Sequence, residues 1–136
     1  MADVDYEKIR KFLNENDHFC VQNGMVLTVV REGYAEAEVE IKDWMMNGLK
    51  VVQGGLLFTL CDFAFAGAAN SYGKPCIAMC GNISFMRPGL GTKLKAVAQM
   101  VNCGRTTCVC DVTIHNDAGK IVVKTTLTGY FLEKKS

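Results

Sequence analysis

The sequence predicts an α+β fold in which an antiparallel six-stranded sheet wraps around one long central helix, with a short helix at the N-terminus. Two observations carry this prediction. The segment 55–71 is apolar almost throughout and has the length of a helix, and two strand patterns precede it while four follow it. A chain of 136 residues fits one domain. We expect that domain over 1–136, with the N-terminal helix and lead-in over 1–20 and the core over 21–133.

The central helix is expected over Gly55–Ser71, where apolar side chains occur around nearly the whole helical circumference. A helix that is apolar on all sides must be buried on most of them. In a domain of this size, a curved sheet is the most economical cover. Tyr72–Pro75 supplies the stop signal. The only charged side chain between Lys50 and Lys74 is Asp62.

Six strands are expected from alternating side chains and from the turn residues between them. The clearest is Tyr34–Ile41, where small and branched apolar residues alternate with Glu36, Glu38 and Glu40. The other five are expected at Met25–Arg31, Cys76–Met86, Lys93–Val101, Thr106–His115 and Lys120–Leu132. Val4–Asn14 carries apolar residues at helical spacing and predicts the N-terminal helix. This arrangement is the hotdog fold.

Charge and hydropathy exclude several classes of partner. The net charge of +1 gives no case for nucleic-acid binding. The acidic start of the chain lacks the features of a signal peptide, and the longest apolar run, Leu56–Ala69, is too short to span a bilayer. We therefore expect a soluble cytoplasmic protein without a membrane or nucleic-acid partner.

The seven cysteines include no Cys-x-x-Cys pair, and neither His18 nor His115 has metal-ligand spacing to a cysteine. Cys108 and Cys110 fall on the same strand face as apolar neighbours. We therefore expect the cysteines to be small buried apolar groups, free in a reducing compartment, with no metal bound.

Asp62 and the glycine pair before the helix are the candidate chemical groups. A lone acid in an apolar helix either bonds a neighbouring loop or subunit, or faces a cleft as a general base or nucleophile; the residue type leaves both readings open. Gly54-Gly55 is either a plain helix start or a place where unpaired first-turn N–H groups stabilise an oxyanion. Eight residues separate Gly54 from Asp62, about 12 Å along a helix. We therefore expect two chains to share one site, with Asp62 of one opposite Gly54 of the other.

These residues also form a recognisable motif. The segment 47–55, Asn-Gly-Leu-Lys-Val-Val-Gln-Gly-Gly, is followed by Leu60-Cys61-Asp62, by Asn82–Pro88 and by Gly104-Arg105-Thr106. The pattern resembles the phenylacetate-degradation (PaaI-like) branch of hotdog thioesterases, in the 4-hydroxybenzoyl-CoA thioesterase superfamily. The resemblance spans about Asn23 to Leu132.

The resemblance implies an acyl-CoA thioesterase that hydrolyses a small aryl- or acyl-CoA ester to the free acid and CoA. It implies catalytic roles for Asp62, Gly54 or Gly55, Asn47 and Gln53. Substrate or CoA contacts are implied at Cys80, Asn82, Phe85, Asn102, Gly104, Arg105, Thr106 and Thr107. Arg105 is the implied phosphate contact. Without the resemblance, Arg105 would be interpreted as a solvated hairpin residue. No cofactor is implied beyond the coenzyme A of the substrate. The implied assembly is a homodimer, extending to a homotetramer, with the site at the subunit interface.

Three positions depart from the family motif. That motif reads His-x-Asn-x-x-Gly-x-x-His-Gly-Gly, and this chain has Met45 in place of its first histidine, Lys50 in place of its first glycine and Gln53 in place of its second histidine. Gln53 donates and accepts hydrogen bonds but is no acid or base at neutral pH. A non-catalytic acyl-CoA-binding protein is therefore one alternative. An acyl-thioester dehydratase or hydratase is another, which needs a histidine in the site.

Overall fold

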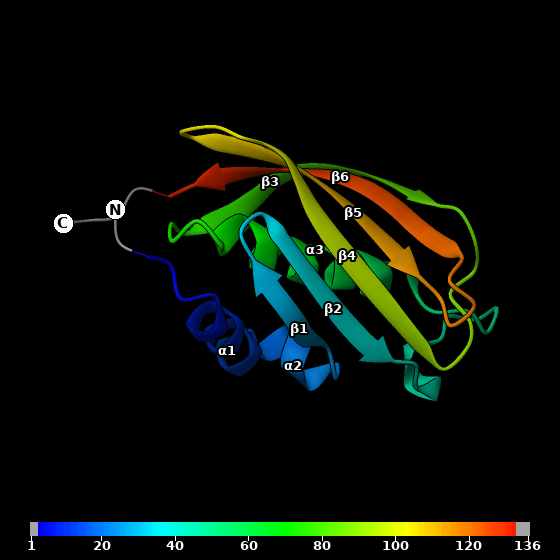
Figure 1. The fold of residues 1–136 in the computed structure, drawn as a ribbon. Coiled ribbons are helices and arrows are strands. Elements are labelled where there is room, and N and C mark those ends of the chain that lie inside the picture. The colour runs from blue at the N-terminus through cyan, green and yellow to red at the C-terminus, as the bar shows by residue number, and fades with distance from the viewer. Residues whose placement is uncertain (1–2, 133–136) are drawn as a thin grey trace.

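The structure, a computed structural model, describes residues 3–132 and shows one antiparallel sheet curved around the helix α3 (Figure 1). The elements in chain order are α1 (Tyr6–Asn16), α2 (His18–Gln22), β1 (Val26–Arg31), β2 (Tyr34–Glu40), the 3-10 turn η1 (Asp43–Met45), α3 (Gly54–Asn70), β3 (Cys76–Phe85), β4 (Lys93–Cys103), β5 (Thr107–His115) and β6 (Ile121–Phe131). The predicted six-stranded sheet, central helix and short N-terminal helix are confirmed. The last residue of the predicted core, 133, lies outside the described residues.

The helix α2 was not predicted. It is only five residues long, so it shows no apolar periodicity, and its one sequence signal is Asp17, whose carboxylate accepts a hydrogen bond from the Cys20 N–H at 3.2 Å. The N-terminal helix begins at Tyr6 instead of Val4, because the Asp5 carboxylate caps the helix by accepting a hydrogen bond from the Lys8 N–H. Within residues 3–132, no helix is long and apolar enough to cross a bilayer.

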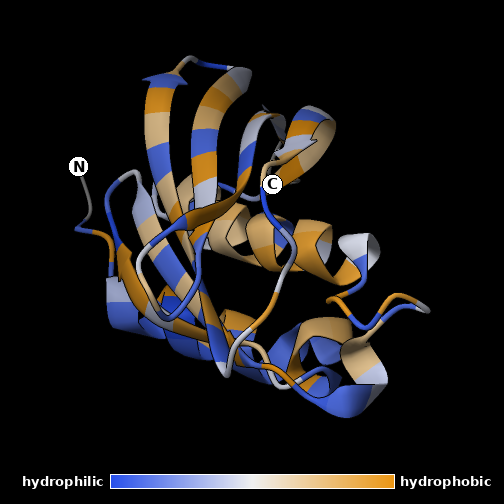
Figure 2. Cartoon of the chain, turned by 90° about the vertical axis from the view of Figure 1, so that its right-hand side faces the viewer, coloured by the Kyte–Doolittle hydropathy of each residue, from blue (hydrophilic) through white to orange (hydrophobic). Residues whose placement is uncertain are grey.

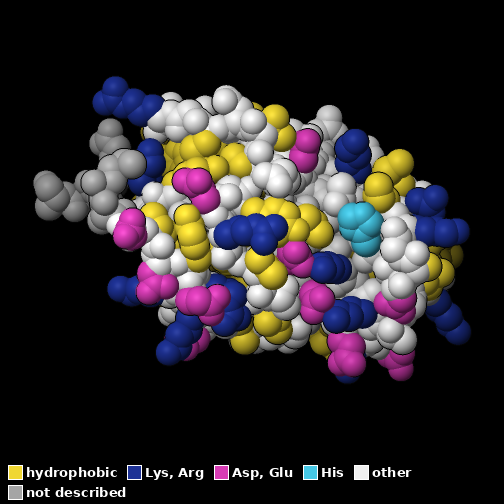
Figure 3. Space-filling view, viewed as in Figure 1, with side chains coloured by type: hydrophobic (Ala, Val, Ile, Leu, Met, Phe, Trp, Pro, Cys, Tyr) yellow, Lys and Arg dark blue, Asp and Glu magenta, His cyan; other side chains and the backbone are white. Residues whose placement is uncertain are grey.

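The strands lie in the order β1-β2-β4-β5-β6-β3, so β1 and β3 form the two edges of the sheet. Hydrophobic and hydrophilic residues alternate along the strands, whereas α3 is hydrophobic over most of its length (Figure 2). The outer face seen in Figure 3 carries charges of both signs. On it, Lys95 pairs with Glu36 at 2.6 Å and Lys93 pairs with Glu38 at 3.1 Å. This mixture of charges gives the outer face no single-sign potential.

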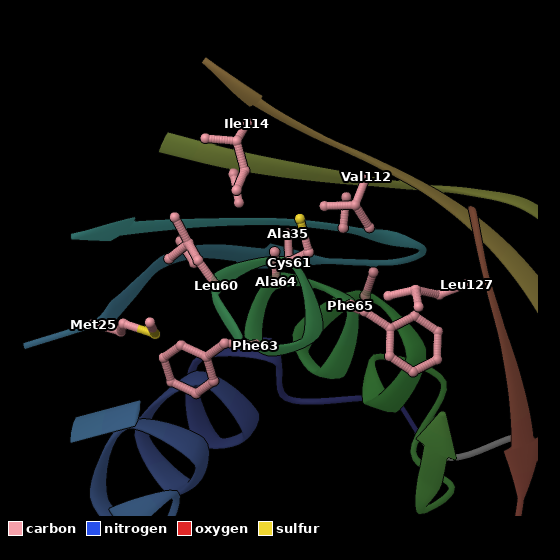
Figure 4. Packing of buried hydrophobic residues seen from close by; sticks show 14 of the residues in the cluster. Met25, Ala35, Leu60, Cys61, Phe63, Ala64, Phe65, Val112, Ile114 and Leu127 are labelled. Carbon is pink, nitrogen blue, oxygen red and sulfur yellow. The ribbon is translucent and has the colours of Figure 1, made fainter. Parts of the chain in front are cut away.

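The concave face of the sheet holds the core against α3 (Figure 4). Small residues let the helix lie close to β2. A Cβ atom added at Gly67 would stand only 2.7 Å from the Cβ of Ala35. Phe65 lies beside Leu127 of β6, whereas Phe63 points away from the sheet toward the N-terminal helices (Figure 4). The core therefore has two parts, one on each side of α3.

Phe65 makes the largest single contribution that we expect to the stability of this core. Its side chain is 1% exposed. A Cβ atom added at Gly129 would lie only 2.6 Å from the Cζ atom of Phe65, so the ring packs against a position that has to be glycine. Phe65→Ala should lower the free energy of unfolding by about 3–5 kcal/mol, through lost burial and the cavity left behind. Denaturant unfolding, monitored by far-UV circular dichroism, measures the free energy of unfolding. Phe12→Ala, at a side chain 60% exposed, is the control and should change it by about 0.5 kcal/mol at most. Equal effects of the two variants would contradict this packing.

The two sheet edges differ in how their backbone groups are satisfied. On β1, Asn14 of α1 bonds both the N–H and the carbonyl of Leu27, at 2.8 and 2.9 Å, and Arg10 adds a bond to the same carbonyl at 3.3 Å. On β3, most side chains are exposed on both faces, including the apolar Ile77 and Met79. An edge strand of ten residues that has a neighbour on one side only, β6, and carries exposed apolar side chains is suited to pairing with another chain.

Candidate functional site

Gln53 and the two glycines after it form the start of α3. The Gln53 Oε1 accepts a hydrogen bond from the Gly55 N–H at 2.6 Å, so the glutamine caps the helix through its side chain. The N–H groups of Leu56 and Leu57 both donate to the Gln53 carbonyl. Among the residues that the structure describes, the Gly54 N–H has no hydrogen-bond acceptor. Of the two glycine amides, Gly54 therefore offers the open donor.

The two glycines also face different hollows of the surface. Gly54 lines a cavity of about 400 Å³ together with Asn47 and Phe85. Its remaining walls are largely apolar and come from Val51, Val52, Leu57, Met86, Arg87, Pro88 and Gly89. Gly55 and Gln53 instead line a second cavity of about 400 Å³, toward α2. Of these two cavities in the described part of the chain, the one at Gly54 combines an open amide with predicted substrate contacts.

Asn47 shapes the loop before α3. Its Oδ1 accepts from the Leu49 N–H at 2.8 Å and from the Val51 N–H at 3.4 Å. Because the carbonyl oxygen is used in this way, only the amide nitrogen of Asn47 remains for a substrate or water in the cavity. Lys50 in the same loop has a φ of 62°, the left-handed region that favours glycine. This explains why the family motif has glycine at that position.

Asp62 lies on the one face of α3 that the sheet leaves uncovered, together with Gly55 and Phe58. The sequence placed Asp62 on a helix expected to be buried on most sides, but Asp62 is exposed in the single chain, because the sheet and the N-terminal helices cover the other sides of α3 and the sheet ends at the edge strand β3. The carboxylate nevertheless stands among apolar groups. Their desolvating effect, followed by repulsion from Asp17, raises the pKa of Asp62, and no hydrogen bond among the described residues offsets it.

Sequence reasoning missed two neighbours of the site. Asp17 comes close to Asp62 only through the fold, since it lies 45 positions earlier in the N-terminal segment. Arg87 forms part of the Gly54 cavity wall, and its guanidinium donates to the Ile121 carbonyl at 2.8 Å. Arg87 was noted only as part of the motif segment Asn82–Pro88, with no role in the site.

The other predicted contacts lie in two further places. Cys80 and Asn82 line a groove between β3 and β6, where the Thr125 hydroxyl donates to the Asn82 carbonyl at 2.6 Å. The remaining contacts belong to the β4–β5 hairpin and its flanks: Asn102, Gly104, Arg105, Thr106 and Thr107. That hairpin lies near Tyr72, beyond the C-terminal end of α3. Seventeen residues of helix place it about 25 Å from Gly54. One chain alone does not bring the hairpin to the glycine pair.

Two predictions about cysteines need correction. Cys20, Cys61, Cys76, Cys108 and Cys110 are buried as expected, but Cys80 and Cys103 are exposed. Cys80 lies on the edge strand β3, where most side chains are exposed, and Cys103 ends β4 at the hairpin. All seven are free thiols.

Comparison with known proteins gives concordant matches over this architecture. The model of the thioesterase superfamily matches residues 49–123, which is more than half of the chain. The acyl-coenzyme A thioesterase PaaI of Escherichia coli is 38% identical over 109 residues, covering 79% of this chain and 78% of that protein. The structure of the E. coli PaaI protein from the phenylacetic acid degradation operon superposes with a TM-score of 0.92 at 31% identity, over 96% of this chain and 95% of the other. A Streptococcus pneumoniae thioesterase protein solved with coenzyme A has a TM-score of 0.82 at 28% identity, over 90% of this chain and 99% of the other.

Proposed function

The chain belongs to the thioesterase superfamily, and on that basis we propose that it hydrolyses a small aryl- or acyl-CoA thioester to the free acid and coenzyme A. The observation that carries the proposal is the open N–H of Gly54 at the start of α3, at a residue that lines a largely apolar cavity. A cavity of about 400 Å³ lies within the range of small-molecule sites and supports a small acyl or aryl group. The reaction requires water and no cofactor.

The helix start supplies the electrostatic part of the mechanism. A thioester carbonyl gains negative charge on its oxygen when it is attacked. The unpaired Gly54 N–H, together with the positive end of the α3 dipole, stabilises that oxygen in the transition state. Gln53 holds the Gly55 N–H and so positions the first turn, without taking part in proton transfer.

Asp62 supplies the other half of the chemistry, as a general base for water or as a nucleophile that forms an anhydride. Its raised pKa makes the ionised carboxylate a stronger base than an ordinary aspartate. Gly54 and Asp62 are eight residues apart on one helix, about 12 Å. The two groups act on one carbonyl only if they come from different chains.

A two-fold dimer across the open edge of β3 is the assembly we propose. The other sheet edge, β1, is occupied by the side chains of Asn14 and Arg10, whereas the outer edge of β3 has no partner strand among the described residues. Pairing two copies of β3 antiparallel would place the two α3 helices side by side in opposite directions. Asp62 of one chain would then approach Gly54 of the other, and Phe58 of each helix would lose its exposure. A tetramer of two such dimers is the larger assembly that the resemblance implies.

The same dimer supports a contact between the β4–β5 hairpin and coenzyme A. Opposed helices bring the C-terminal end of one α3, with its hairpin, toward the N-terminal end of the other. Arg105 at the hairpin tip would then be the phosphate ligand, with Thr106 and Thr107 beside it. The Streptococcus thioesterase with coenzyme A bound shows that a neighbour of this fold accommodates the molecule.

A cytoplasmic location is proposed as well. All seven cysteines are free, and free thiols persist in reducing compartments. Coenzyme A esters are intracellular metabolites, which agrees with that location.

The pH dependence of turnover should reflect Asp62. Desolvation by the apolar groups around it, and then the charge of Asp17, raise the pKa of Asp62, so kcat/KM should fall as the pH decreases through a pKa higher than that of an ordinary aspartate. Asp17→Asn removes the repelling charge while still capping α2, and should move this acid limb to lower pH. Initial rates between pH 4 and pH 8, on the order of ten points per variant, measure the limb. An unmoved limb would show that Asp17 does not act on the catalytic carboxylate.

The function is tested with a panel of CoA esters that includes phenylacetyl, benzoyl and short straight-chain acyl groups. Chromatography should quantify both coenzyme A and free acid, because the seven thiols of the protein react with the usual thiol reagents. Multiple turnovers giving equal amounts of both products support the proposal. Tight retention of an intact ester would instead indicate a binding protein. Formation of an unsaturated or hydrated ester would indicate a dehydratase or hydratase, although neither His18 nor His115 lines the Gly54 cavity.

A further inference from the structure

The β4–β5 hairpin carries a pair of cysteines that the proposed hydrolysis does not use. Cys103 is the last residue of β4, Cys108 is the second residue of β5, and the two are direct partners in the ladder. The Gly104 N–H donates to the Thr107 carbonyl at 2.8 Å next to them, so Cys103 and Cys108 occupy a position where the strands exchange no hydrogen bonds. Cα atoms at such a position are about 4.5 Å apart, within the range that a disulfide spans.

We propose that Cys103 and Cys108 form a thiol–disulfide exchange site that closes the hairpin when the chain meets a small disulfide. The two thiols differ in the way that such a site requires. Cys103 is exposed, so it can meet a disulfide from solution, whereas Cys108 is 1% exposed and can react only with a sulfur delivered to it within the fold. Directly opposed positions put their side chains on the same face of the sheet, so a rotation of Cys103 about χ1 brings its Sγ toward Cys108.

The exchange proceeds in two balanced steps. The Cys103 thiolate attacks one sulfur of the small disulfide, that S–S bond breaks, and one small thiolate leaves. The Cys108 thiolate then attacks the Cys103 sulfur of the mixed disulfide and releases the second small thiolate. Two protein thiols lose two protons and two electrons, and the small disulfide is reduced to two thiols. Burial, with a contribution from Cys108, raises the pKa of Cys103, so the first step should accelerate with increasing pH.

Cys76 is the neighbour that could be mistaken for the partner of Cys108. Their Sγ atoms are 3.8 Å apart, which is the one sulfur–sulfur contact found among the described residues. However, Cys76 lies on β3 and Cys108 on β5, with Gly129 of β6 between them. The two sulfurs meet only because Gly129 has no side chain. Strands on either side of a third are about 9.5 Å apart, so this pair cannot be bridged without displacing the backbone.

The test uses the full-length folded protein, oxidised glutathione as the probe, and trypsin digestion under non-reducing conditions. Cleavage after Lys95, Arg105 and Lys120 places Cys103 and Cys108 on different peptides, 96–105 and 106–120. Mass spectrometry should find these peptides joined, with fragmentation assigning the link to Cys108 and not to Cys110. Two glutathione thiols should be released per chain. Cys80→Ser, at the other exposed cysteine, is the matched control and should leave the link unchanged.

Two variants separate the steps. Cys103→Ser should abolish the link, whereas Cys108→Ala should stop the reaction at a glutathione adduct on Cys103. The proposal is overturned if the 96–105 peptide stays unlinked in the wild-type chain, or if the link joins Cys108 to the peptide 51–93 that carries Cys76. It is also overturned if Cys108→Ala gives no adduct on Cys103.

Discussion

Asp62→Asn should lower kcat for CoA-ester hydrolysis by about 10²- to 10⁴-fold, because the variant keeps the shape of the side chain but removes the base or nucleophile. The loss should appear in kcat and not in the affinity for the ester, since the carboxylate acts on the reacting carbon and not on coenzyme A. Steady-state kinetics with the best ester of the panel measure both quantities. Asp111→Asn, an acid on the outer face of β5, is the matched control and should turn over at the wild-type rate.

The same substitution should leave the fold intact. A carboxyl group whose pKa is raised in the folded state favours folding while it is protonated, and that contribution disappears as the pH rises through the raised pKa. Once ionised, Asp62 therefore destabilises the fold, and a neutral asparagine removes this destabilisation. The midpoint of thermal unfolding should stay equal or rise. Full turnover in Asp62→Asn would contradict the mechanism, whereas a loss of turnover with a lower midpoint would point to a structural acid.

Gly54→Pro should lower kcat by about 10²- to 10³-fold, the usual effect of removing one oxyanion donor. Proline lacks the N–H that Gly54 leaves unpaired, so no hydrogen bond of the fold is lost. It is well tolerated at the first position of a helix. The preceding Gln53 already has φ −59° and ψ 133°, the conformation that residues before proline prefer. The helix should therefore form as before.

Gly54→Ala separates the lost donor from added bulk. It keeps the N–H, and its Cβ would stand 3.4 Å from the Phe85 ring, at the limit of ordinary contact. Its rate should therefore lie well above that of Gly54→Pro. Equal losses in the two variants would mean that space beside Phe85, and not the amide, limits the reaction. Circular dichroism of both variants confirms that α3 is retained.

Periodicity and turn residues were enough to predict the sheet and the central helix. The alternation of Tyr34–Ile41 and the all-round apolar character of α3 are local patterns with one economical packing solution. The short helix α2 was missed because five residues show no periodicity. The exposed face around Asp62 was missed because the order of strands in the sheet decides which side of the helix stays open. Strand order is a long-range property that alternation does not encode.

In the candidate site, too, local spacing predicted some features, and the others depend on the three-dimensional fold. Spacing along the chain placed Gly54 and Asp62 on one helix, and the structure agrees. Spacing could not tell which glycine amide is open, since that depends on how the Gln53 side chain turns back to Gly55. It also could not show that the hairpin at Arg105 lies at the other end of α3, because hairpin position follows from sheet topology. Both facts now favour a site built from two chains.

The most direct test of the shared site mixes two variants that are each inactive. Asp62→Asn and Gly54→Pro are combined in equal amounts, unfolded, refolded together and assayed against each variant refolded alone. If the site joins Asp62 of one chain to Gly54 of its partner, the mixture should recover about a quarter of the wild-type rate, because half of the dimers are mixed and each of these holds one intact site. If the mixture is no more active than the two variants measured separately, the two groups do not act together across a dimer and the shared site is refuted.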